Sequence, residues 1–225
     1  MPSPLQNIHA AGIKSILLIN KVDRLIRELQ MTPQDMFLLF QRIIDYVNND
    51  VGTTFDPTNG DVIFASGIFQ SISKSSHSGI GGWGFTLRDI AQLYSTKFQI
   101  PLNNLIPKLW GQNFFNNSTK RWQTTSNGTL PSGFEQFVLN PIIKIFESCF
   151  HNNKNQLDII FDKTGIVLTE SEKKYDEKKL CRLVMNRWLP LDRVFCEVVV
   201  KVIPSPLEAG KVAVKELYRG KKRGK

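Results

Sequence analysis

The chain has 225 residues, 41% of them hydrophobic and 22% charged, and a formal net charge of +9. This is the composition of a soluble globular protein with enough apolar residues for one full domain and part of another. No apolar run is long enough to cross a membrane, and no signal peptide is visible. The positive charge favours an anionic partner, with nucleic acid or the ribosome ahead of a membrane. Three scattered cysteines are expected to be reduced core residues of a cytoplasmic protein.

The first predicted element is a buried parallel strand beginning at Ser15, with Asn20, Lys21 and Asp23 at its carboxyl end. Open α/β sheets bind ligands at this end of their strands. The spacing N-K-x-D is the guanine-recognition signature of GTP-binding proteins. A carboxylate at Asp23 can accept hydrogen bonds from the ring N–H and from the exocyclic amine of guanine, a pair that adenine does not offer. The simpler alternative is an ordinary turn from strand to helix with polar caps.

Helices and a second strand follow up to about residue 98, where the first α/β unit is expected to end. A short helix is predicted at 24–29, and a longer one at 32–48, which Thr32 caps and Pro33 opens. A second strand is predicted at 61–66, a loop rich in serine and glycine at 70–82, and an amphipathic helix at 86–98.

The second half of the chain is predicted to be mainly helical. The aromatic residues of 110–122 flank a turn and indicate a hairpin. Helices are expected at 134–150, 153–164, 170–188 and 193–202, and an alternating pattern at 211–218 predicts a strand.

These segments together resemble the translational GTPases related to elongation factor 2. The resemblance spans nearly the whole chain in the expected order, and the matching segments are INKVDRLIRELQ (19–30), VIFASGI (62–68), GWGFTL (82–87), KLWGQNFFN (108–116), FEQFVLNPIIKIF (134–146), RLVMNRWLP (182–190) and IPSPLEA (203–209). It implies an α/β fold, the C-terminal half of a P-loop GTPase-type domain with a helical extension and the start of a β-barrel domain. Residues 1–100 would close the GTP-binding domain, 101–203 would continue it with helices, and 204–225 would begin a truncated β-barrel domain.

The resemblance also implies a guanine site for GTP or GDP. The residues that match the family's base-contacting positions are Asn20, Lys21, Asp23, Ser66, Gly67 and Ile68. The sequence departs from the family in lacking the phosphate-binding loop G-x-x-x-x-G-K-[ST] and the D-x-x-G-H segment, and in an extra loop between Ile68 and Gly82. No catalytic residue or Mg²⁺ ligand is therefore assigned, and the chain alone is not expected to hydrolyse GTP. It is expected to be a fragment of a longer protein or a truncated gene product.

Three functions remain open. Some segments are most similar to the elongation factor-like GTPase of 60S subunit maturation, which implies action with the Shwachman–Diamond protein to release initiation factor 6 from the large ribosomal subunit. Others are most similar to elongation factor 2, which implies ribosomal translocation. The third is a non-catalytic module that binds a nucleotide and docks on RNA through its charge. In each case basic residues at 173–179 and 221–225 are candidates for contact with ribosomal RNA, and the alternative is that they form ordinary solvated surfaces.

Overall fold

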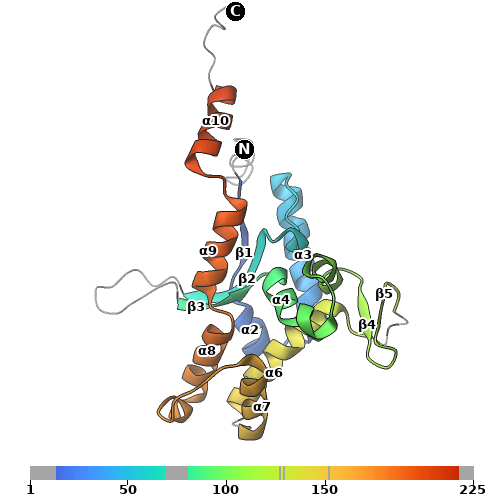
Figure 1. Ribbon diagram of the computed structural model, residues 1–225, viewed down its shortest axis with the longest axis vertical. Coiled ribbons are helices and arrows are strands. Elements are labelled where there is room, and N and C mark those ends of the chain that lie inside the picture. The colour runs from blue at the N-terminus through green and yellow to red at the C-terminus, as the bar shows by residue number, and fades with distance from the viewer. Residues whose placement is uncertain (1–13, 69–80, 127, 129, 152, 218–225) are drawn as a thin grey trace, which may run out of the picture.

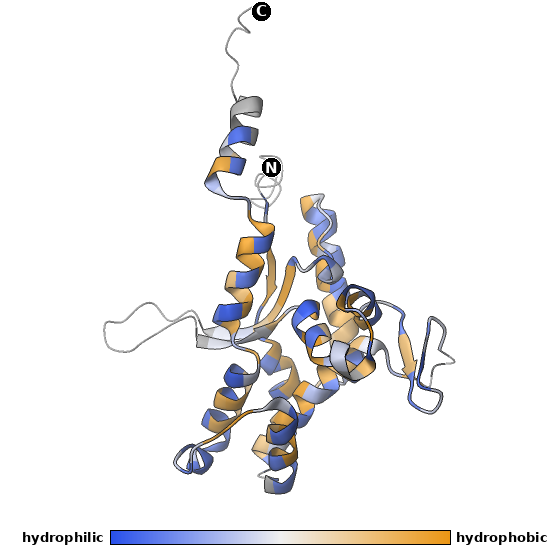
Figure 2. Ribbon diagram, in the orientation of Figure 1, coloured by the Kyte–Doolittle hydropathy of each residue, from blue (hydrophilic) through white to orange (hydrophobic). Residues whose placement is uncertain are grey.

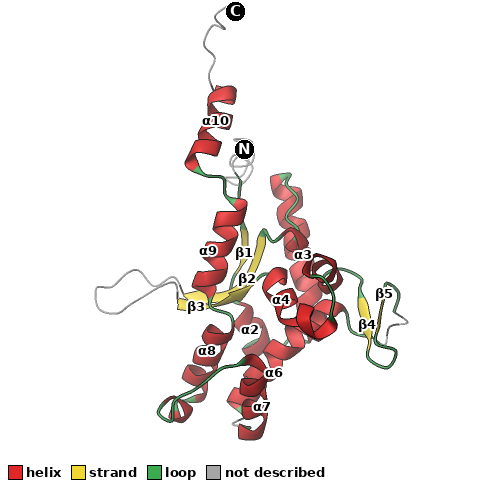
Figure 3. Ribbon diagram, viewed as in Figure 1, coloured by secondary structure: helices red, strands yellow, loops and turns green. Residues whose placement is uncertain are grey.

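The computed structural model of the chain describes residues 14–68, 81–126, 128, 130–151 and 153–217, and these residues form an α/β fold. A three-stranded sheet lies among helices in the order β1 (Leu17–Ile19), β2 (Val62–Ile68) and β3 (Gly81–Phe85). The two strands β4 (Phe114–Asn116) and β5 (Arg121–Gln123) form a separate hairpin at one side of the molecule (Figures 1 and 3). The predicted α/β class is therefore confirmed.

The two predicted strands of the first unit are present and pair in parallel, with Ile19 opposite Phe64. The helices α2 (Val22–Arg27) and α3 (Pro33–Val51) connect them. The start of α3 agrees with its predicted caps, because the Thr32 hydroxyl accepts from the Asp35 N–H at 3.1 Å. This crossover brings the carboxyl ends of β1 and β2 side by side.

Strand β3 corrects the prediction of a loop up to Gly82. It pairs with β2 in antiparallel fashion, with Gly82 opposite Gly67. Gly82 has φ +137°, and a Cβ built there would lie 2.6 Å from both the Gly67 Cα and the Ser66 carbonyl oxygen. The glycines therefore permit close strand packing rather than a turn. The rest of that predicted loop, 70–80, lies outside the described residues.

The sheet is covered on both faces, because alternate residues of β2 are buried on opposite sides. Phe64 packs against Phe40 and Phe134, with ring centroids 5.1 Å and 5.4 Å apart. Ile63 belongs to a second cluster, formed with α9 (Leu191–Val202). Figure 2 shows hydrophobic residues, in orange, along β1, β2 and α9. A central strand buried on both faces agrees with its continuous apolar sequence.

The other helices follow the predicted pattern closely up to residue 164. Helix α4 (Leu87–Phe98) starts at a capping box made by Thr86 and Asp89. The predicted hairpin is present, and the predicted helix at 134–150 is a π-helix, Glu135–Leu139, that continues into α6 (Asn140–Phe150). The remaining elements of this part are a 3-10 helix at Pro57–Asn59, α5 (Leu102–Leu105), a 3-10 helix at Ile106–Leu109 and α7 (Lys154–Thr164).

The predicted basic helix at 170–188 is divided in two. A short 3-10 helix covers Glu172–Lys174, and α8 spans Glu177–Trp188. The break falls at Asp176, because its side chain accepts from the Lys179 N–H at 2.9 Å and so caps a new helix.

The strand predicted at 211–218 is wrong over its described part, because α10 (Pro206–Leu217) is helical. The reason lies just upstream. The Glu208 carboxylate accepts from the Ser205 N–H at 2.9 Å, the Ser205 hydroxyl accepts in return from the Glu208 N–H at 3.4 Å, and Pro206 opens the helix. The described part of 204–225 therefore contains no β-strand. None of the helices in the described ranges combines the length and the apolar content needed to cross a bilayer.

Candidate ligand-binding cleft

A cleft of ≈ 390 Å³ opens at the carboxyl ends of β1 and β2. Four of the six predicted base-contacting residues line it: Lys21, Asp23, Ser66 and Gly67. A fifth, Asn20, does not line the cleft but accepts hydrogen bonds from the backbone of Lys21, in the turn after β1, and of Gly67, near the end of β2. The sixth, Ile68, is the last residue of β2, where its backbone pairs with Gly81. Its side chain lies outside the described part of the chain.

The side chain of Asn20 holds the two motifs together. Its Oδ1 accepts from the Gly67 N–H at 3.0 Å, and its Nδ2 donates to the Gly67 carbonyl oxygen at 3.3 Å. The same Oδ1 also accepts from the Lys21 N–H at 2.8 Å. One amide therefore fixes the turn after β1 against the end of β2, two segments 47 positions apart in the sequence.

The turn after β1 presents Lys21 and Asp23 to the cleft. Lys21 has the left-handed φ of +68°, an unfavourable conformation for a residue with a side chain, and it immediately precedes α2. Val22 is completely buried and anchors this turn in the core. The Lys21 side chain is exposed and Asp23 is half-buried, so both are able to meet a ligand. Strain at a polar surface turn is typical of functional sites.

The opposite wall of the cleft comes from helices far along the chain and was not predicted from the sequence. Helix α8 contributes Lys178, Cys181 and Arg182, and α6 contributes Phe146 and Phe150. The only sequence signal for the α8 wall is its helical spacing, since residues three and four apart share a face.

The wall is held in place through β3. Asn186 of α8 donates a hydrogen bond to the Gly82 carbonyl oxygen, and Gly84 N–H donates to the Leu189 carbonyl oxygen at 3.0 Å. Trp83 stacks beside Phe85 and meets Phe146, with ring centroids 6.5 Å and 6.0 Å apart. Trp83 is 3% exposed and is therefore a packing residue of the core.

Two buried thiols contact each other at the wall of the cleft. Cys181 lines the cleft, and contact with the Cys149 sulfur, together with burial, raises the pKa of its thiol far above the usual value. Cys181 is therefore a neutral thiol at pH 7, and both residues are buried, as expected for core cysteines. Cys196 corrects the prediction of three core cysteines, because it is exposed on α9.

The lining of the cleft is predominantly basic. Its ionisable side chains, cysteine apart, are Lys21, Arg24, Arg27, Lys178, Arg182, Asp23 and Glu28. Glu28 forms a salt bridge with Arg24 at 2.9 Å, an i,i+4 pair on α2. Asp23 makes no salt bridge within 4 Å in the described ranges. Its carboxylate is therefore the acidic group of the cleft that remains for a ligand.

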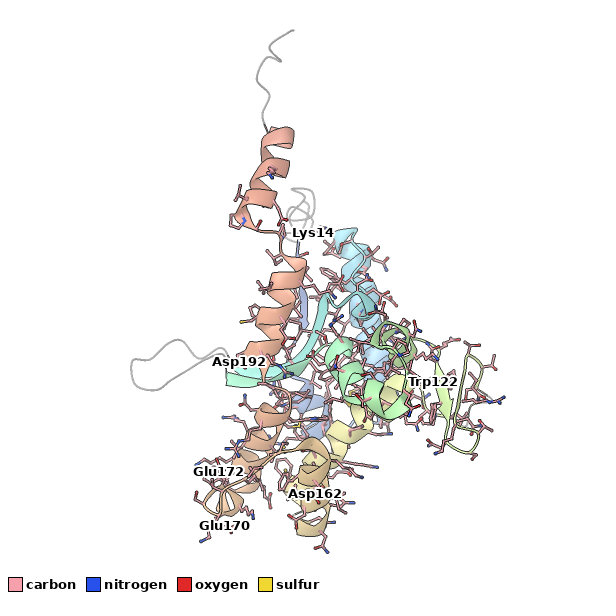
Figure 4. The ribbon with its side chains drawn as sticks, viewed as in Figure 1. Lys14, Trp122, Asp162, Glu170, Glu172 and Asp192 are labelled. Atoms are coloured by element: carbon pink, nitrogen blue, oxygen red, sulfur yellow. The ribbon has the colours of Figure 1, made fainter. Side chains whose placement is uncertain are left out.

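Several other residues labelled in Figure 4 do not line this cleft. Glu170 and Glu172 occupy the turn that precedes α8, Asp162 lies on α7, Asp192 begins α9, and Trp122 belongs to the hairpin (Figure 4). Across the described residues, no three side chains of the kinds that bind metals converge. No known protein-family model matches the chain.

Proposed function

We propose that the cleft binds the guanine base of a nucleotide and that the chain is the base-binding part of a translational GTPase related to elongation factor 2. One observation carries the proposal. Asn20 joins the N-K-x-D turn to the Ser66–Gly67 segment, so that Asp23 and Ser66 line the same cleft. At ≈ 390 Å³ the cleft falls within the roughly 300–1,000 Å³ range of small-molecule sites.

Each lining residue has a distinct role in this proposal. Asp23 accepts from the ring N–H and the exocyclic amine of guanine, an arrangement that rejects adenine. The aliphatic part of Lys21 covers one face of the purine. The Gly67 N–H already donates to Asn20, so we assign the Ser66 hydroxyl as the donor to the guanine O6.

The proposed biological role is action on the large ribosomal subunit in a GTP-driven cycle, with GTP and GDP as ligands. The segments nearest the base are most similar to the maturation GTPase, so the first candidate is release of initiation factor 6 together with the Shwachman–Diamond protein. Translocation, as in elongation factor 2, is the second. Phosphoryl transfer would need a phosphate-binding loop, a D-x-x-G-H segment and Mg²⁺ ligands that this sequence does not contain. A non-catalytic module that binds RNA is the third candidate, and the basic lining of the cleft favours it.

The test is nucleoside selectivity. We expect the chain to bind guanosine at least tenfold more tightly than adenosine in a calorimetric titration. In Asp23→Asn the amide replaces an acceptor with a donor, so guanosine binding should weaken by roughly tenfold to a hundredfold while xanthosine binding strengthens.

Asp192→Asn is the matched control. It makes the same chemical change at an exposed site at the start of α9 that does not line the cleft. It should leave the nucleoside affinities unchanged. Equal affinity of the wild-type chain for guanosine and adenosine, or no effect of Asp23→Asn, would contradict the proposal.

A further inference from the structure

Two of the three cysteines meet in the core, on helices that are separated in the sequence. Cys149 lies near the end of α6 and Cys181 in the first half of α8, and α7 lies between them along the chain. Both are free thiols, 1% and 3% exposed, and their sulfurs are in hydrogen-bond contact. The fold has therefore already brought together the two atoms that a disulfide would join.

The cleft gives this buried pair a connection to solvent. Buried cysteines are usually inert, but the wall of the cleft of ≈ 390 Å³ includes Cys181. Hydrogen peroxide is only slightly larger than a water molecule, which occupies about 30 Å³ in the liquid. A peroxide molecule in the cleft therefore meets the pair at Cys181.

The contact gives the two sulfurs different reactivities. The Cys181 S–H donates to the Cys149 sulfur, which stabilises the Cys149 thiolate and lowers the pKa of Cys149, although burial acts in the opposite direction. The same contact raises the pKa of Cys181, which therefore keeps its proton. Cys149 is the better nucleophile, because the thiolate and not the thiol is the reactive form.

We propose that Cys149 and Cys181 form a reversible disulfide when a peroxide enters the cleft. The Cys149 thiolate attacks one peroxide oxygen and the O–O bond breaks. The departing hydroxide takes up the proton that the thiol had released, which gives water and a sulfenic acid on Cys149. The Cys181 sulfur then attacks the Cys149 sulfur, and the sulfenic hydroxyl leaves with the Cys181 proton as a second water. The two thiols lose two electrons in total, and these reduce the peroxide.

The disulfide would connect the two helices that form the wall of the cleft opposite the N-K-x-D turn. Helix α6 supplies the aromatic side chains of this wall and α8 supplies its basic side chains. The C-terminal half of α8 is already attached to β3 through the hydrogen bond from Asn186 to Gly82. The new bond would attach the N-terminal half of α8 to α6, so that peroxide would act directly on the wall of the binding site.

The experiment treats the whole chain with hydrogen peroxide and uses mass spectrometry of the intact protein and of its non-reduced peptides. We expect the loss of two hydrogen atoms and one pair of peptides joined through Cys149 and Cys181. Dithiothreitol should restore both thiols. The proposal is refuted if both residues remain thiols at a peroxide dose that oxidises the exposed Cys196, or if the joined peptides contain Cys196.

Cys196→Ser is the matched control, because it removes the exposed thiol of α9 and leaves the buried pair intact. It should form the same disulfide at the same rate. Cys181→Ser should form no internal disulfide and should instead gain oxygen at Cys149. Cys181→Ala repeats this test without placing a hydroxyl in the core, in case the serine variant does not fold. A joined pair of peptides in the alanine variant would contradict the assignment of Cys181.

A ligand in the cleft should protect the pair, and this expectation alone rests on the proposed function. After the Cys149 contact and burial, the Asp23 carboxylate also raises the pKa of the Cys181 thiol, so Asp23 and Cys181 border the same part of the cleft. Guanosine bound through Asp23 would therefore cover Cys181. At about ten times its dissociation constant, guanosine should slow disulfide formation about tenfold, because only empty clefts react.

The two proposals fail in different ways. If guanosine is selected through Asp23 but no disulfide forms, the base site remains and the redox proposal fails. If the disulfide forms equally fast with and without guanosine, the redox proposal remains and the assignment of guanosine to this part of the cleft fails.

Discussion

Replacing Asn20 with Asp tests whether one amide holds the two sides of the cleft together. An aspartate keeps the acceptor that serves the Lys21 and Gly67 N–H groups at 2.8 Å and 3.0 Å. It loses the 3.3 Å hydrogen bond to the Gly67 carbonyl oxygen and places two oxygens against each other. Because Asn20 is exposed and water compensates in part, we expect Asn20→Asp to lower the free energy of unfolding by about 1 kcal/mol at pH 7. Asn20→Ala loses all three hydrogen bonds and should lower it by about 2 kcal/mol.

The assay is urea unfolding followed by tryptophan fluorescence, since Trp83 is buried beside the cleft. Below about pH 4 the new carboxyl is protonated and donates again, so the deficit of Asn20→Asp should shrink while that of Asn20→Ala should not. Asn116→Asp is the control. The Asn116 Oδ1 accepts from the Ser118 and Thr119 N–H groups, and its amide nitrogen makes no hydrogen bond to the described residues. A deficit for Asn20→Asp that is independent of pH, or no larger than that of Asn116→Asp, would refute the reasoning.

Further substitutions test other parts of the structure. Lys21→Gly should be more stable than Lys21→Ala by about 1 kcal/mol in urea unfolding, because glycine adopts the left-handed φ without strain. The Arg187 guanidinium lowers the pKa of Glu172 to about 2 from an ordinary value of 4.5. The stabilisation by this pair is therefore present above about pH 4.5 and lost as the pH falls towards 2, so the Tm values of Glu172→Gln and the wild type should differ at pH 7 and converge near pH 2. Gly133→Ala would push a methyl group into the Lys108 carbonyl oxygen and the Trp122 ring, and should cost about 2 kcal/mol in thermal unfolding, whereas an unchanged Tm would show that this contact yields easily.

Local sequence signals predict the elements that carry the candidate base-binding residues. An apolar run followed by Asn20 marks the end of β1, and a second apolar run before Ser66 marks β2. Thr32 and Pro33 mark the start of α3. These signals involve residues that are adjacent in the sequence, where propensity and capping decide the structure.

The sequence prediction missed strand β3 because its glycines are needed for tertiary packing and not for a turn. Gly82 and Gly84 resemble turn residues in the sequence, but in the structure they allow close packing. A Cβ at Gly84 would lie 2.6 Å from the Leu191 Cδ1 of α9. A single sequence does not contain the distance between β3 and α9, so it cannot distinguish the two explanations.

The sequence prediction missed helix α10 although a local capping signal for it is present in the sequence. The alternation after Lys211 suits a strand, but the reciprocal capping of Ser205 and Glu208 starts a helix that runs through it. The α8 wall of the cleft has no such local signal, because only the tertiary fold brings α8 beside β3. Asn186 reaches Gly82 across 104 positions of the sequence, and no local pattern specifies that contact.

The Asn20 hydrogen bonds also determine when the cleft can form. Asn20 and Gly67 are 47 positions apart, so the intact pocket exists only after β1 and β2 have paired, and non-local pairing of this kind is a slow part of folding. A nucleoside that binds only the paired state would stabilise it by mass action. Guanosine binding measured during refolding would therefore follow the pairing of β1 with β2 separately from the formation of the helices.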